Sequence, residues 1–111
     1  MKFGISYNTG YYGVDPDGMI AVARHAEDCG FESFYTPEHI ALYPGARVGA
    51  VEFPPALPIA DPLETLSFVA AATDRILLGT AVLLLPYHHP VVLAKRLESW
   101  IAPHSKIVTS R

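Results

Sequence analysis

The stretch "RILLGTAVLLLP", residues 75–86, is nearly apolar on both of the faces that a strand would present. Strands of this kind are typical of parallel sheets covered by helices on both sides. Two shorter strand patterns precede it, "MKFGISY" at residues 1–7 and "FESFYTPEH" at residues 31–39. Helical patterns lie between and after these three stretches. The alternation predicts an α/β fold with a parallel sheet and right-handed crossovers.

Each predicted strand is followed by a segment with helix-start signals. Asp15 and Asp61 can cap helices that begin with proline, and Pro90 opens the third helix. Glu64, three residues after Asp61, is expected to complete a capping box. Gly30 suits the position that ends the first helix.

Residue spacing also predicts which side of each helix is buried. The polar side of the first helix includes Glu27, and the apolar side of the second includes Phe68. Pro103 is expected to break the third helix. Residues 40–60 contain four prolines and two glycines, and are expected to form an irregular loop.

Length and composition narrow the class of protein. The 111 residues suffice for one small domain, half of them are hydrophobic, and the mean hydropathy is +0.25. The net charge of −3 and the lack of a basic stripe argue against nucleic-acid binding. The longest apolar stretch, residues 76–85, is about half of the roughly 20 residues that span a membrane. A single cysteine, Cys29, forms no internal disulfide, so we expect a cytoplasmic protein.

Candidate site residues lie where the strands are expected to end. Parallel α/β folds bind ligands outside the carboxyl ends of their strands. Residues 8–12, 38–43 and 86–89 leave those ends. Tyr11 and Tyr12 in the first segment could line an aromatic pocket.

Four ionisable side chains in these segments raise the question of a metal. Glu38, His39, His88 and His89 could supply carboxylate and imidazole ligands. Their spacing matches no known metal motif, so we predict no metal. His88 and His89 could instead be loop residues or border a cofactor. His39 is the strongest functional candidate, because it follows a carboxylate at a strand exit.

Gly79 and Thr80 interrupt the apolar strand. Such a break indicates either a bulge or a tight packing point. It could equally allow a flat ligand to approach the backbone, with the Thr80 hydroxyl as a hydrogen-bond donor.

The sequence resembles the luciferase-like monooxygenase family. The resemblance rests on "MKFGI" at residues 1–5, "ARHAEDCGFESFYTPEH" at residues 23–39 and "RILLGTAVLLLPYHHPVVLAKRL" at residues 75–97. The family includes bacterial luciferase, other flavin-dependent monooxygenases and oxidoreductases that use the deazaflavin coenzyme F-420.

The resemblance implies a (β/α)8 barrel, of which residues 1–97 would supply about three βα units. FMN or coenzyme F-420 would lie at the carboxyl-terminal mouth, where a flavin activates oxygen and a deazaflavin transfers hydride. His39 would be catalytic, while His88 and His89 would shape a turn. The expected cofactor-binding residues are Gly79, Thr80 and Ala81, and the expected substrate pocket contains Tyr11, Tyr12 and Glu38.

The chain also departs from the family. A barrel of this kind needs about 250 residues, and residues 98–111 form a divergent tail. We therefore expect a truncated oxidoreductase that is inactive alone and could form a homo-oligomer through exposed barrel surfaces. The alternatives are a non-catalytic assembly module that folds with a partner, and a piece of a metal-dependent hydrolase barrel.

Overall fold

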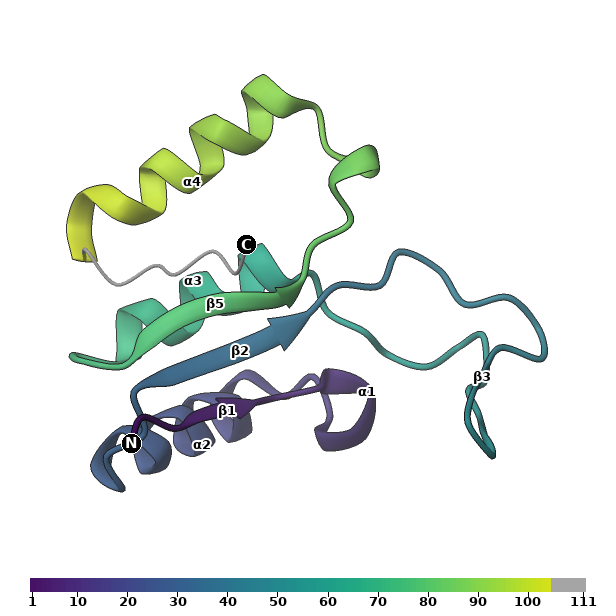
Figure 1. Ribbon diagram of the computed structural model, residues 1–111, viewed down its shortest axis with the longest axis horizontal. Coiled ribbons are helices and arrows are strands. Elements are labelled where there is room, and N and C mark those ends of the chain that lie inside the picture. Colours follow the sequence, from purple (N-terminus) through teal and green to yellow (C-terminus); the bar gives the residue numbers. More distant parts are fainter. Residues whose placement is uncertain (105–111) are drawn as a thin grey trace.

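Three parallel strands form the centre of the fold. The computed structural model describes residues 1–104 and places β1 (Gly4–Ser6), β2 (Ser33–Pro37) and β5 (Leu77–Val82) in the order β1-β2-β5 (Figure 1). Both pairings are parallel, with Ile5 opposite Phe34 and Phe34 opposite Leu78. The predicted parallel α/β sheet is confirmed, although each strand is shorter than its sequence pattern.

The helices begin where their caps predict. In α2 (Pro16–Asp28) the Asp15 carboxylate accepts a hydrogen bond from Gly18 N at 2.8 Å. In α3 (Pro62–Ala72) Asp61 Oδ1 accepts from Leu63 N at 2.8 Å and from Glu64 N at 3.0 Å. The predicted capping box is wrong, because the Glu64 carboxylate accepts a hydrogen bond from an arginine of the last helix instead.

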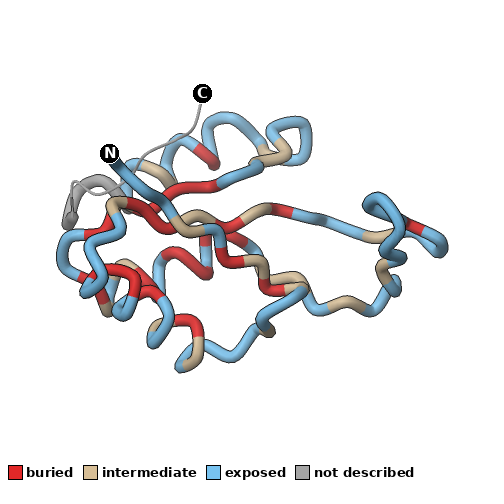
Figure 2. The backbone as a smooth tube through the Cα atoms, turned by 60° about the horizontal axis from the view of Figure 1, so that its bottom comes forward, coloured by how far each residue is buried: buried red, intermediate tan, exposed pale blue. Residues whose placement is uncertain are grey.

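The hydrophobic core lies on one face of the sheet. Phe34 and Leu78 point from the strands towards α2 and α3, where Ala23 and Leu66 are fully buried. Figure 2 shows the buried residues gathered where the sheet meets these helices. The opposite face carries no helix in the part of the chain that the structure describes (Figure 1).

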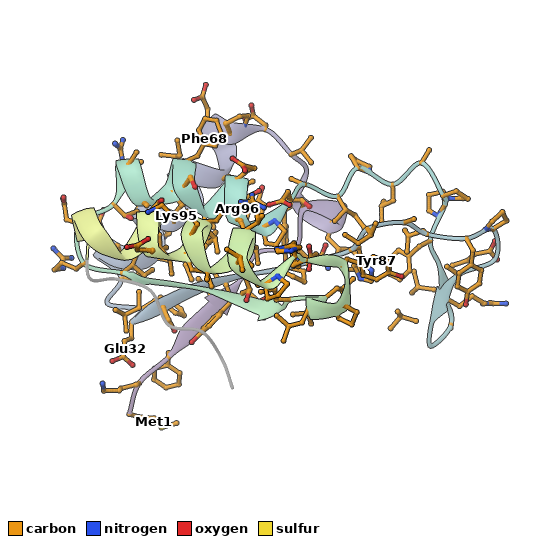
Figure 3. All side chains as sticks on the ribbon, turned by 90° about the horizontal axis from the view of Figure 1, so that it is seen from above. Met1, Glu32, Phe68, Tyr87, Lys95 and Arg96 are labelled. Atoms are coloured by element: carbon orange, nitrogen blue, oxygen red, sulfur yellow. The ribbon has the colours of Figure 1, made fainter. Side chains whose placement is uncertain are left out.

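Ion pairs connect the last helix, α4 (Pro90–His104), to the start of α3. Arg96 of α4 reaches Glu64 at 2.5 Å and Asp61 at 3.7 Å (Figure 3). The predicted break at Pro103 is wrong, because the helix continues to His104. The helix ends one residue after Pro103, so the proline interrupts only its last turn. Residues 105–111 of the predicted divergent tail lie outside the described residues.

Two predicted helix faces are also wrong. Glu27, expected on the polar side of α2, is only 8 % exposed, because its carboxylate binds the chain that enters β5. Phe68, expected on the apolar side of α3, is 58 % exposed and points away from the sheet (Figure 3). The apolar side of α3 is therefore wider than the part of the helix that the sheet covers.

The proline-rich segment after β2 contains structure that the sequence did not predict. Residues 47–52 form a small antiparallel hairpin from β3 (Arg47–Val48) and β4 (Val51–Glu52). Gly49 has a φ of 60°, which suits the tight turn of a two-residue hairpin. A second missed element, α1 (Thr9–Tyr12), is capped by the Asn8 side chain. Figure 1 shows the hairpin extending beyond the sheet.

Candidate functional site

The carboxyl ends of all three parallel strands lie at one edge of the sheet (Figure 1). The chain leaves β1 into α1, leaves β2 at Glu38, and leaves β5 into a loop with a short 3-10 helix, Leu85–Tyr87. Thr9 Oγ1 accepts a hydrogen bond from Ala60 N at 3.1 Å, so the far end of the proline-rich segment returns to the same edge.

Glu38 is buried at this edge and joins two strand exits. Its side chain is 2 % exposed. One carboxylate oxygen accepts a hydrogen bond from Leu84 N at 2.5 Å, and the other lies 2.8 Å from His88 Nε2. The backbone of Glu38 also donates to Val82 O at 3.1 Å. The carboxylate therefore points into the β5 exit loop rather than into an open pocket.

A β-bulge lies beside this contact. Thr36 pairs with Thr80, but the next pair joins Pro37 to Val82, so Ala81 is the extra residue. The sequence had indicated a bulge as one explanation of the Gly79–Thr80 break. Bulges redirect the side chains that follow them.

Strand alternation separates the three residues expected to touch a cofactor. Thr80 is opposite Thr36 and shares the face of Phe34, so its side chain is directed towards the helix layer, where it is buried. Gly79 alternates to the opposite face but is buried, whereas Ala81, the bulge residue that follows Thr80, is exposed. The backbone of Thr80, rather than its hydroxyl, is therefore the part that can border a ligand on the open face.

His39 is exposed and lies in a different environment from Glu38. It borders a pocket of about 250 Å³ that the proline-rich segment forms. The other lining residues are mostly apolar: Asn8, Ala41, Leu42, Tyr43, Ala46, Arg47, Val48, Phe53, Leu57 and Ile59. Asn8 and residues 41–43 lie in segments that the sequence placed at the strand exits, whereas the lining residues from Ala46 to Ile59 were missed. The length of the segment was the signal that could have found them.

The two tyrosines of the predicted substrate pocket are exposed and face different neighbours. Tyr11 makes an edge-on contact with Phe53, with ring centroids 5.8 Å apart, and so touches the wall of the His39 pocket. Tyr12 packs against Tyr7 at 5.3 Å and lines a separate pocket of about 380 Å³ beside β1. Burial, and then the negative charge of Asp15, raise the pKa of Tyr7.

The geometry gives little support to a metal centre. Within residues 1–104, no group of three or more His, Cys, Asp or Glu side chains converges as a metal site would require. Glu38 and His88 meet, while His39 and His89 are exposed. In the same part of the chain, no helix combines the length and apolar character needed to cross a bilayer.

The family model for luciferase-like monooxygenases matches residues 1–98. The chain belongs to this family. An uncharacterised protein of Mycobacterium tuberculosis is 35 % identical over 106 residues, and the match covers 89 % of this chain and 36 % of that protein. Limonene 1,2-monooxygenase of Rhodococcus erythropolis is 35 % identical over 78 residues, which cover 70 % of this chain and 17 % of the enzyme.

A solved structure supports the fold. The oxygenating constituent of 3,6-diketocamphane monooxygenase from Pseudomonas putida, a type II Baeyer–Villiger monooxygenase in complex with FMN, superposes with a TM-score of 0.64 at 23 % identity. The match covers 86 % of this chain and 24 % of that one. This chain therefore spans about a third or less of the relatives that it matches.

The two ends of the open sheet face differ in the size of their side chains. At the amino end, a Cβ added to Gly4 would lie 2.5 Å from Ser33 Oγ and 3.1 Å from Tyr35, so side chains already fill that part. Towards the carboxyl end, Gly79 has no side chain and is buried, whereas Ala81 has only a methyl group and is exposed.

Proposed function

We propose that residues 1–98 form the first three βα units of a (β/α)8 barrel in a flavin- or deazaflavin-dependent oxidoreductase. The observation that carries this proposal is the bulged carboxyl end of β5, where the exposed Ala81 follows the buried Gly79, in a chain of the luciferase-like family. In the proposed enzyme this surface forms one wall of the cofactor site. Turnover would require barrel strands beyond these three, because barrels of this type have about 250 residues.

Each part of the site has a proposed role. The backbone of Gly79, Thr80 and Ala81 borders the ring, and the exposed His39 imidazole accepts or donates a proton beside it. The cofactor supplies either oxygen activation or hydride transfer, and the protein orients it. FMN is the first cofactor to test, because the solved neighbour is a complex with FMN.

The substrate is proposed to be a small, mainly apolar molecule. The pocket beside His39 has a volume of about 250 Å³, and most of its wall is aliphatic or aromatic. Phe53, Leu57 and Ile59 provide the apolar surface, while His39 and Arg47 provide polar groups at its border. One of the relatives is a limonene monooxygenase, which is compatible with an apolar substrate.

Cofactor binding provides the direct test. FMN and coenzyme F-420 are titrated separately into the 111-residue chain, and ring fluorescence is followed. Ala81→Val places a branched side chain under the proposed ring, at an exposed position, and should weaken binding at least tenfold. Ala71→Val, on an exposed position of α3, is the matched control and should leave the affinity unchanged. Binding that survives Ala81→Val unchanged would contradict the placement of the ring.

His39 is tested by turnover. Because the side chain is exposed, His39→Ala should leave the urea midpoint of this chain unchanged, and the same substitution in a full-length relative should lower turnover at least tenfold. Ile40→Ala, an exposed neighbour, is the control. Equal turnover by wild type and His39→Ala would remove His39 from the mechanism.

A second candidate function is assembly through the sheet. Strands β1 and β5 each have one unpaired edge among the described residues, and such edges pair readily with another chain. We propose that, without further strands of its own, the chain forms homo-oligomers through these edges. Light scattering coupled to size exclusion tests this: a monodisperse monomer at 100 µM, on the order of the concentrations at which exposed strand edges associate, would contradict it.

A further inference from the structure

The most heavily buried carboxylate at the functional edge of the sheet, Glu38, lies outside the pockets described above. Glu38 is 2 % exposed and the His88 side chain is 12 % exposed, so their contact at 2.8 Å is shielded from water. Neither side chain lines the pockets described above. A shielded carboxylate is costly unless hydrogen bonds satisfy it, and here both oxygens are satisfied.

The partners of Glu38 all belong to one segment, the exit of β5. Its backbone N–H bonds to Val82 O, its carboxylate accepts from Leu84 N, and its second oxygen meets His88. These contacts begin directly after the extra residue Ala81. They therefore hold the chain immediately beyond the bulge at three successive points.

The other backbone hydrogen bonds of this loop are local. They run from Leu85 N to Leu83 O, from Tyr87 N to Leu84 O and from His88 N to Leu85 O, so they shape the turn without joining it to β2. Leu85 and Tyr87 are exposed, with 60 % and 71 % of their surface accessible, and no side chain caps the short 3-10 helix that they bound. The Glu38–His88 pair supplies a contact from this loop to the exit of β2.

We infer that Glu38 and His88 are positioning residues that hold the bulged end of β5 in place. Glu38 does not touch the reacting groups; it fixes the backbone of Gly79–Val82 through the β5 exit. The effect of the pair on cofactor affinity rests on the proposed function, whereas its effect on the β5 exit does not.

Four variants separate this role from general destabilisation. His88→Leu removes the nitrogen that contacts Glu38, and Glu38→Gln removes the negative charge. His88→Gln restores an N–H donor at nearly the position of Nε2 and serves as the rescue. His89→Leu makes the same apolar replacement at the exposed neighbouring residue and is the matched control.

The first readout is amide hydrogen exchange in the full chain, resolved by residue. His88→Leu and Glu38→Gln should accelerate exchange at Leu84 at least tenfold and shift the amide signals of Ala81 and Val82. His88→Gln should restore most of the protection, and His89→Leu should match wild type. Uniform acceleration across β2 and β5 would indicate global destabilisation and would overturn the inference, as would unchanged exchange at Leu84.

The second readout is FMN affinity in the same variants. His88→Leu should weaken FMN binding at least tenfold, with recovery in His88→Gln. Loss of protection at Leu84 with unchanged FMN affinity would overturn the link to the cofactor. If wild-type chain binds neither FMN nor coenzyme F-420, the cofactor assignment of this chain fails, and the exchange data alone decide whether the pair positions β5.

Discussion

Replacement of Glu27 should reveal a polar contact that is essential to the fold. The Glu27 carboxylate accepts hydrogen bonds from the backbone N–H groups of Asp74, at 3.1 Å, of Arg75, and of Ile76, at 2.7 Å. The guanidinium of Arg75 also donates to Glu27 O at 3.3 Å. These contacts join the last turn of α2 to the chain that enters β5.

The size of the effect follows from where these amides lie. Ile76 is 1 % exposed, so its N–H would lose its partner without gaining water, which costs about 1–3 kcal/mol. Asp74 and Arg75 are exposed, and their N–H groups can turn to water at a combined cost of about 1 kcal/mol. Glu27→Ala should therefore lower the free energy of unfolding by about 2–4 kcal/mol. Glu27→Gln keeps one acceptor oxygen and should cost about 1–2 kcal/mol.

The same contact predicts a pH dependence. Burial by itself would raise the pKa of Glu27, but the N–H groups of Arg75, Asp74 and Ile76 and the charge of Arg75 outweigh it, so the pKa lies below the usual 4.5. The unfolded chain then binds the proton more readily than the folded chain. The stabilisation is fully present above pH 4.5 and is lost as the pH falls through the lower pKa of the folded state. Glu27→Gln lacks this contribution.

Urea unfolding followed by circular dichroism, at pH 7 and in steps to about pH 3, a range that brackets ordinary carboxyl pKa values, measures both effects. Glu32→Gln is the control, because Glu32 is a surface carboxylate paired with the exposed Lys2. Its midpoint at pH 7 should match that of wild type. The reasoning is refuted if Glu27→Gln and Glu32→Gln shift the midpoint equally, or if wild type and Glu27→Gln lose stability in parallel on acidification.

Four further substitutions test the helices, each by urea unfolding at pH 7. Leu66→Ala, at a fully buried position, should lower the free energy of unfolding by about 2–5 kcal/mol. Phe68→Ala, at a 58 % exposed position, should lower it by less than about 0.5 kcal/mol. The reverse order would contradict the orientation of α3. Asp61→Ala removes the acceptor for two N–H groups and should cost about 1 kcal/mol, and an unchanged midpoint would mean that the cap contributes nothing. Gly30→Ala, at a φ of 83°, should cost about 1–2 kcal/mol, and a gain in stability would contradict that conformation.

Features set by neighbouring residues were predictable from the sequence. The helix starts at Asp15 and Asp61 depend on a side chain that reaches two or three residues along the chain, so the local pattern is sufficient. The parallel sheet was predictable because an apolar run such as residues 75–86 requires cover from helices.

Features set by distant contacts were not predictable. The carboxylate of Glu27 binds backbone groups 47–49 residues away, and a helical wheel contains no information about them. Phe68 looks like a core residue because the spacing of apolar residues does not show how wide a surface the sheet covers. The hairpin at residues 47–52 has strands of two residues each, which are too short to give an alternating pattern.

The pair Glu38–His39 shows most clearly what a site motif can and cannot specify. The sequence placed both residues at the strand exit, and the structure does so as well. Successive side chains of an extended chain point in opposite directions, so only one of the two can face the interior. Glu38 does so and binds Leu84 and His88, which leaves His39 exposed beside the pocket. His88 and His89 divide in the same way, with His88 partly buried against Glu38 and His89 exposed. In each doublet one residue is occupied in holding the edge of the sheet, and only the other is available for chemistry.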